Sequence, residues 1–204
     1  MQASALISIN EFVQAAHKIK HKVTCEGNVN TKVEAEVRLH GHSNIGPDHV
    51  VNKLEDFGWK IVSTEDLADR VCDNNNRHRI IYVDGVPVGC EIVHKRSVGK
   101  RNKWQFGNWL ATASVSLEEE NVEKLSTETK HVKLMRRIRL QQPKSSAVCV
   151  DVSQVRMGKT FHEALQCHPH TETEIELDVN SDADALAAQA GLCDAISVVT
   201  CVCV

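Results

Sequence analysis

Polar and apolar residues alternate along two segments of the chain, residues 32–41 and residues 171–179. The alternating charged residues are Glu34, Glu36 and Arg38 in the first segment, and Glu172, Glu174 and Glu176 in the second. Successive side chains of a strand point to opposite faces, so each segment is predicted to be a strand with one charged and one apolar face. Three carboxylates on one face repel one another unless water or a cation offsets the repulsion.

The same reading predicts the other elements. A β-hairpin is expected with Asp84 and Gly85 at its turn. All expected strands lie at residues 32–41, 77–96 (the hairpin), 111–118, 131–141, 146–156 and 171–179. Helices are expected at residues 7–22, 46–59 and 181–192, the last ended by Gly191. Residues 195–204 are expected to extend the fold as a strand or a helix, or to contact a partner.

This order of elements predicts one domain over residues 1–204, of mainly β (α+β) class, with helices near both ends. Residues 1–30 are expected to form a helical lead-in, and residues 181–204 a C-terminal helix and tail. The net charge of −3 does not indicate a protein that binds nucleic acid over its whole surface, so any site for a polyanion must be local.

No apolar run reaches the roughly 18 residues of a membrane span, and no signal peptide is evident at the N-terminus. The eight cysteines include no CxxC pair, and Cys167, His168 and His170 lack the paired spacing of a structural zinc site. We therefore expect an intracellular protein that is neither secreted nor bound to a membrane.

Two further expected strands carry basic residues at alternate positions, Arg77 and Arg79 in one, and Lys133, Arg137 and Arg139 in the other. Carboxylates on two strands can bind a hard divalent cation, Mg²⁺ or Mn²⁺, through oxygen ligands. Arginines on neighbouring strands can bind phosphate oxygens through paired N–H groups. Together these features favour phosphoryl-transfer chemistry, and the absence of a GxxxxGKS/T loop excludes a P-loop enzyme.

With these features the chain resembles the metal-dependent RNA triphosphatases of mRNA capping found in fungi, protozoa and some large DNA viruses. These enzymes belong to the triphosphate tunnel metalloenzymes. The resemblance covers residues 31–180 and rests on segments in the family's order: VEAEVRLHG, RHRIIYVDG with EIVHKR, ASVSLEEE, RRIRL, VCVDVSQV and ETEIEL. It implies a closed eight-stranded antiparallel β-barrel, with charged side chains lining a tunnel and a few flanking helices.

The resemblance also implies roles for individual residues. Those implied to bind Mg²⁺ or Mn²⁺ are Glu34, Glu36 and Glu176. Those implied in catalysis are Glu172 and Glu174, of which one orients or deprotonates a water, with Arg79, Arg137, Arg139 and Asp151. Those implied to bind substrate are Arg38, Arg77, Lys95, Arg96, Glu118, Lys133 and Ser153.

The implied reaction is hydrolysis of the γ-phosphate of 5′-triphosphate RNA to a 5′-diphosphate end, the first step of mRNA capping. The implied partner is a separate RNA guanylyltransferase, because no KxDG motif is present, and a homodimer is left open. The implied location is the nucleus, or the viral replication site if the source is a large DNA virus. Three alternatives stay open: a tunnel hydrolase of inorganic triphosphate, thiamine triphosphate or nucleotides; a non-catalytic barrel binding polyphosphate or RNA ends; and a β-rich interaction protein.

Two local features add expectations. The family usually has a basic residue two positions before the aspartate, where this chain has Cys149, so Asp151 is expected to lack a partner. Residues 95–109 interleave basic residues with Trp104, Phe106 and Trp109. Such a segment can bind single-stranded RNA by charge and stacking, but we favour a hairpin end whose aromatic residues cover the barrel.

Overall fold

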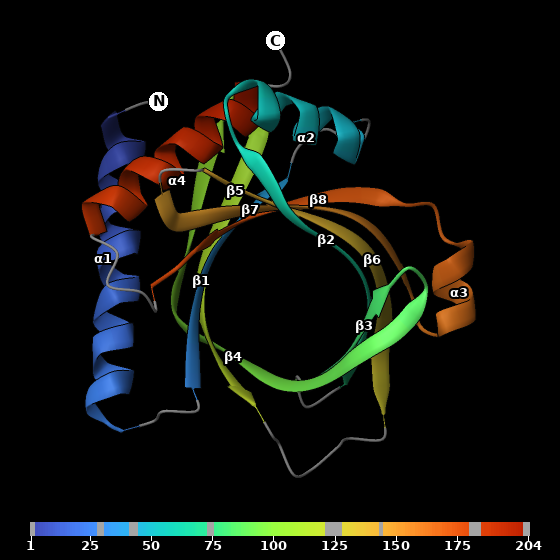
Figure 1. Cartoon of the computed structure of the whole chain (residues 1–204). Coiled ribbons are helices and arrows are strands. Elements are labelled where there is room, and N and C mark those ends of the chain that lie inside the picture. The colour runs from blue at the N-terminus through green and yellow to red at the C-terminus, as the bar shows by residue number, and fades with distance from the viewer. Residues whose placement is uncertain are drawn as a thin grey trace.

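The computed structural model describes residues 3–27, 31–40, 45–72, 76–120, 128–142, 145–179 and 185–201. Within these residues, eight strands form a closed antiparallel barrel in the order β1-β5-β4-β3-β2-β6-β7-β8 (Figure 1). The strands are β1 (Thr31–His40), β2 (Lys60–Cys72), β3 (Asn76–Val83), β4 (Val86–Phe106), β5 (Trp109–Glu120), β6 (Thr129–Gln142), β7 (Ser145–Gly158) and β8 (His170–Leu177). The helices are α1 (Ala3–Cys25), α2 (Pro47–Asp56), α3 (Phe161–Gln166) and α4 (Ala185–Thr200). The predicted fold class is confirmed.

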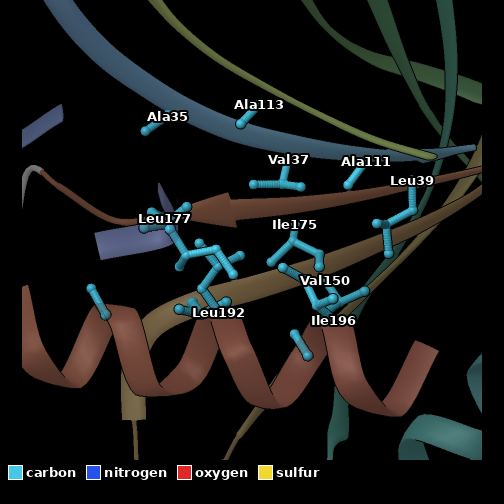
Figure 2. Packing of buried hydrophobic residues seen from close by; sticks show 14 of the residues in the cluster. Ala35, Val37, Leu39, Ala111, Ala113, Val150, Ile175, Leu177, Leu192 and Ile196 are labelled. Atoms are coloured by element: carbon cyan, nitrogen blue, oxygen red, sulfur yellow. The ribbon is translucent and has the colours of Figure 1, made fainter. Parts of the chain in front are cut away.

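The main hydrophobic core lies outside the barrel, between its wall and three helices. Helices α1, α2 and α4 gather on one side of the barrel, and α3 lies apart from them (Figure 1). Figure 2 shows Leu192 and Ile196 of α4 facing Val150 of β7 and Ile175 of β8, all four fully buried. The apolar face of β1 is directed outward into this core, so its charged face is directed into the barrel.

Three elements differ from the sequence predictions. Strand β2 was not predicted, because its inward face mixes charged and apolar residues and its first residues, Ile61 and Val62, are exposed. Helix α3, capped by the side chain of Thr160, was also not predicted. Helix α4 does not end at Gly191 but continues to Thr200. Gly191 permits a close approach to β7 instead, since an added Cβ would lie 2.9 Å from Val148 Cγ2.

The aromatic residues at the end of β4 cover the barrel, as we favoured. Trp104 and Trp109 are buried in the outer core. Trp104 packs edge-to-face against Phe12 of α1 at 5.8 Å, and its Nε1 donates a hydrogen bond to Ser8 Oγ at 2.9 Å. None of the described helices has the length and hydropathy of a membrane span.

Gly158 ends β7 directly beneath α3 and gives a test of this packing. An added Cβ would lie 2.5 Å from the backbone nitrogen of Ala164, which cannot move without displacing the helix. We expect Gly158→Ala to lower the free energy of unfolding by about 1–3 kcal/mol, measured by thermal denaturation. Gly89→Ala is the control, because its nearest neighbour would lie at an ordinary 3.6 Å; an equal loss in both variants would contradict the close approach.

Candidate active site

The inward faces of the strands enclose a cavity of about 490 Å³ that is lined mainly by charged residues. Its carboxylates are Glu34, Glu36, Glu65, Asp69, Glu91, Glu118, Asp151, Glu174 and Glu176. Its cations are Lys32, Arg38, Arg77, Arg79, Lys95, Lys133, Arg137 and Arg139. Burying so many charges is tolerated only because carboxylates and cations lie opposite one another.

The acidic wall is built by β1 and β8, which lie side by side. Glu36 is directly opposite Glu176, and Arg38 is directly opposite Glu174. The ammonium of Lys95 reaches across from β4 and donates hydrogen bonds to the carboxylates of Glu34 and Glu36. Burial opposes the ionisation of Glu34, but the adjacent Lys95 charge outweighs it and lowers the pKa of Glu34 to about 2. Glu34 is therefore ionised at neutral pH, and the Lys95 ammonium neutralises it.

The carboxylates predicted to bind a metal suit a hard cation by chemistry and register. Glu34 and Glu36 follow each other along one face, and Glu176 lies across from Glu36. Each is held by a cation: Lys95 lies 3.3 Å from Glu36, and Arg139 lies 2.6 Å from Glu176. Among the described residues, no three His, Cys, Asp or Glu side chains are gathered into a metal-binding group. The carboxylate oxygens of Glu34, Glu36 and Glu176 are ligands of the kind that Mg²⁺ and Mn²⁺ prefer. In this structure Lys95 and Arg139 contact these carboxylates.

The basic wall consists of two similar units, each with a buried aspartate between two arginines. Arg139 makes two hydrogen bonds of 2.8 Å to Asp151, and Arg137 lies 3.6 Å from the same carboxylate. The second unit has Asp69 in the middle, with Arg79 hydrogen-bonded at 2.8 and 2.9 Å and Arg77 at 3.5 Å. Paired hydrogen bonds fix the planar guanidinium groups and hold them toward the tunnel.

Asp151 is thus not without a partner, and that expectation is wrong. The β6–β7 register places Arg139 directly opposite Asp151, so the arginine supplies the charge that Cys149 lacks. Cys149 is half-buried, and burial raises the pKa of its thiol, with Arg139 acting in the opposite direction. The thiol is therefore neutral at ordinary pH, and no second cation is needed there.

Sequence reasoning missed Asp69, which is only 2% exposed. It belongs to β2, the strand that was not predicted. The available signal was the alternation of Glu65, Leu67, Asp69 and Val71, all of which line the cavity. Mixed charged and apolar positions do not separate such a strand from a loop.

The other predicted residues are placed as follows. Lys133 donates to Glu172 at 2.6 Å, Arg38 pairs with Glu174 at 2.5 Å, and Ser153 is buried opposite Arg137 in the β6–β7 register. Arg96 is exposed and alternates with the inward-facing Lys95, so it does not line the tunnel. The expectation that places Arg96 at the substrate is corrected accordingly.

Two donors in the tunnel have no acceptor. The Nε atoms of Arg38 and Arg137 are buried without a hydrogen-bond partner among the described residues. Buried N–H groups without acceptors cost free energy, about 1–3 kcal/mol each, which a bound oxyanion would recover. The tunnel therefore offers charge-bearing donors to a ligand with several negative oxygens.

The lowered pKa of Glu34 predicts a pH dependence of stability. Its carboxylate stabilises the fold fully above its ordinary pKa of 4.5, and this contribution is lost as the pH falls toward 2. Glu118 acts with the opposite sign, since burial and the nearby Glu34 raise its pKa. In urea titrations with chelator, we expect Glu34→Gln to remove roughly 2 kcal/mol of the stability that the wild type loses between pH 5 and pH 2. Identical pH profiles would contradict the Lys95–Glu34 pairing.

A closed eight-stranded barrel, with facing acidic and basic strands around a central tunnel, is the fold that the resemblance to the triphosphate tunnel metalloenzymes implies. No family model matches the sequence, and no curated protein matches it. Solved structures do match, and several of them are RNA triphosphatases. The predicted resemblance is therefore confirmed at the level of the fold.

The mimivirus capping-enzyme triphosphatase has a TM-score of 0.58 and 12% identity, with 98% of both chains covered. An RNA triphosphatase of S. pombe has a TM-score of 0.63 and 11% identity, with 93% of this chain and 91% of that chain covered. The PH1012 protein of Pyrococcus horikoshii has a TM-score of 0.50 and 16% identity, covering 81% and 89%. At such identities the likeness establishes the fold, and function must be argued from the tunnel.

Proposed function

We propose that this protein hydrolyses the γ-phosphate of 5′-triphosphate RNA in a reaction that depends on Mg²⁺ or Mn²⁺. The observation that carries the proposal is a tunnel with an acidic wall in which the buried Nε atoms of Arg38 and Arg137 make no hydrogen bond among the described residues. A chain of phosphates supplies both the acceptors for these donors and the oxygen ligands of a metal.

The metal would be held by Glu34, Glu36 and Glu176, and when bound it supplies Lewis-acid polarisation of the terminal phosphate. Lys95 and Arg139, which contact these carboxylates, keep the acidic wall neutralised. The closed barrel separates the reacting phosphate from bulk water, which strengthens each of these interactions.

Glu172 and Glu174 would position the attacking water. Burial opposes ionisation of both, but Lys133 lowers the pKa of Glu172 and Arg38 lowers that of Glu174. Carboxylates with lowered pKa values are good hydrogen-bond acceptors and weak bases. We therefore assign them the orientation of the water rather than early removal of its proton, which suits a loose phosphoryl-transfer transition state.

Arg79, Arg137 and Arg139 would stabilise the charge that develops on the bridging and terminal oxygens. Their aspartate partners act by position: Asp69 and Asp151 hold the guanidinium planes and do not touch the phosphates. Arg77, Lys95 and Lys133 would neutralise the rest of the phosphate chain, while Glu118 and Ser153 shape the surroundings of these cations.

The test is release of labelled γ-phosphate from 5′-triphosphate RNA, compared with a nucleoside triphosphate, thiamine triphosphate and inorganic triphosphate, with Mg²⁺, Mn²⁺ or chelator. The proposal expects metal-dependent release from RNA with a 5′-diphosphate product. Faster turnover of inorganic or thiamine triphosphate would favour the first alternative. Binding of triphosphate RNA without any release would favour a non-catalytic barrel, and no binding would favour an interaction protein.

The product of the proposed reaction defines its partner, because a 5′-diphosphate end is the acceptor for guanylyl transfer. One similar structure is the RNA triphosphatase domain of a trifunctional mimivirus mRNA capping enzyme, with a TM-score of 0.54 and 14% identity. For this chain we propose a guanylyltransferase on a separate chain, in the nucleus or at a viral replication site. Adding a guanylyltransferase and labelled GTP to the reaction should yield capped RNA only after γ-phosphate release.

A further inference from the structure

The tunnel has two mouths that differ in their side chains. In the barrel order, β1, β2, β4 and β7 run in one direction, and their neighbours run in the other. One mouth is therefore surrounded by the C-terminal ends of β1, β2, β4 and β7. We name it the bulge mouth, because β4 is irregular there between Val98 and Asn102. The other mouth, at the N-terminal ends of the same strands, is named the acidic mouth.

The irregularity in β4 shapes the bulge mouth. Val98 pairs with Val115 and Asn102 pairs with Ala113, so four steps along β4 face two steps along β5. The extra residues include Gly99, whose φ of +78° favours glycine. Arg101, two residues after Gly99, lines a second cavity at this bulge.

A second cavity of about 390 Å³ opens at this bulge. Its own lining residues are Ser97, Arg101, Ser114 and Ser116, and it shares Glu36, Arg38, Arg77 and Lys95 with the main tunnel. The shared residues join the two cavities into one path. Along that path the lining changes from dense ion pairs to serine hydroxyls and Arg101, which has no ion-pair partner among the described residues.

The lining charges are distributed unequally between the two mouths. The cations nearer the bulge mouth are Arg38, Arg77, Arg101 and Lys133. The carboxylates nearer the acidic mouth are Glu65, Glu91, Glu118 and Glu176. Glu172 and Glu174 also lie toward the bulge mouth, but Lys133 and Arg38 neutralise them, as Lys32 and Arg139 neutralise Glu176 at the acidic mouth. Arg77 is likewise paired, with Asp69. Among the described cations of the bulge mouth, Arg101 is therefore the one without an ion pair, and its charge attracts a polyanion to this mouth.

We propose that the bulge mouth is where the RNA strand leaves the tunnel, with Arg101 binding the first phosphodiester. Ser114 and Ser116 donate their hydroxyl protons to Glu36 and Glu34, so Arg101 is the donor of this cavity that remains for the strand. This inference rests on the proposed function and deepens it by assigning the direction of the substrate. With the γ-phosphate at the acidic wall, the α-phosphate and the nucleotides that follow must pass one mouth. Of the residues that the structure describes, those at the bulge mouth include an exposed cation without an ion pair, Arg101, and such a cation binds a phosphate backbone without reading bases.

The direction can be read by crosslinking. A 5′-triphosphate RNA with 4-thiouridine at its second nucleotide is irradiated with the protein in chelator, and the attached peptides are identified by mass spectrometry. The inference expects crosslinks within residues 97–103. Crosslinks near Glu65 or Glu91 would place the strand at the acidic mouth and overturn it. Failure of the wild type to bind the RNA at all would overturn both the inference and the proposed function.

A pair of charge reversals isolates the role of Arg101. Arg101→Glu and Lys100→Glu change charge equally at adjacent positions, and both residues are exposed, but only Arg101 lines the path. Fluorescence anisotropy with a 5′-triphosphate RNA decamer should show affinity about tenfold lower for Arg101→Glu, with a salt slope reduced by about 0.7, and little change for Lys100→Glu. Equal losses in both variants would sink the inference, while hydrolysis by the wild type would leave the proposed function standing.

Discussion

Glu36→Gln is expected to lose triphosphatase activity by about a thousandfold while the protein stays folded. Glu36 lies at the centre of the acidic wall, opposite Glu176 and hydrogen-bonded by Lys95 and Ser114. Glutamine keeps the size of the side chain and its bond from Ser114. It removes the negative charge that a divalent cation requires of an oxygen ligand. The loss should appear in kcat, and raising the Mn²⁺ concentration should restore part of it.

The matched control is Glu119→Gln on β5. Glu119 alternates with the inward-facing Glu118 and does not line the tunnel. Its replacement should change the rate by less than about twofold. Binding of Mn²⁺, followed by calorimetry, gives a second reading that does not depend on turnover. Turnover and Mn²⁺ affinity near those of the wild type in Glu36→Gln would remove Glu36 from the proposed metal ligands.

Asp69→Asn is expected to cause the largest loss of stability in the tunnel wall, about 3 kcal/mol. The aspartate side chain is 3% exposed, and it neutralises Arg79 and Arg77, whose side chains are 14% and 25% exposed. Asparagine fits the same space but leaves two guanidinium charges without a buried counter-charge. Burial lowers the pKa of Arg79, but the hydrogen bonds that Arg79 donates to Asp69 outweigh it and raise the pKa, so the arginine depends on the charge of Asp69.

Asp66→Asn gives the comparison for Asp69, because Asp66 lies on the same strand and is exposed. Its replacement should stay within about 0.5 kcal/mol of the wild type. Urea unfolding measures both variants. We further expect inorganic sulfate or triphosphate to recover part of the loss in Asp69→Asn, because an anion can neutralise the freed arginines. A variant as stable as the wild type would mean that the arginines find other partners.

Much of the barrel could be predicted from single strands. In β1, Val33, Ala35, Val37 and Leu39 alternate with charges, and the structure buries all four outside the barrel. The strand could be predicted because one of its faces packs against helices and the other faces the tunnel, so apolar and charged residues alternate regularly. In β2 the inward face holds both Leu67 and Asp69. Charged and apolar residues therefore do not alternate regularly along β2, and the strand could not be predicted.

The pairings inside the tunnel could be predicted only in part. Alternation places Arg137, Arg139 and Asp151 on inward faces, as the structure does. It does not tell which cation meets which carboxylate, because the pairing depends on the register between strands and some partners come from strands far apart in the sequence. Lys95 and Glu34 are 61 residues apart and meet only after the barrel closes. The pairing of Arg139 with Asp151 follows from the register between β6 and β7, and no local sequence pattern predicts that register.

The bulge in β4 shows how such a barrel can change length. Ser97 and Arg101 both line the path, while Val98 and Trp104 both join the outer core. The alternation of inward and outward side chains is the same before and after the bulge, because the bulge adds an even number of residues. An odd insertion within a strand would exchange the two faces, sending valines into the tunnel and carboxylates into the apolar core. In this barrel the single-residue register shifts lie close to strand ends, between Ile61 and Ser63, Val71 and Cys72, and Ile81 and Tyr82. Among barrels of this architecture, insertions in the middle of a strand should therefore come in steps of two, and odd ones should be confined to strand ends and turns.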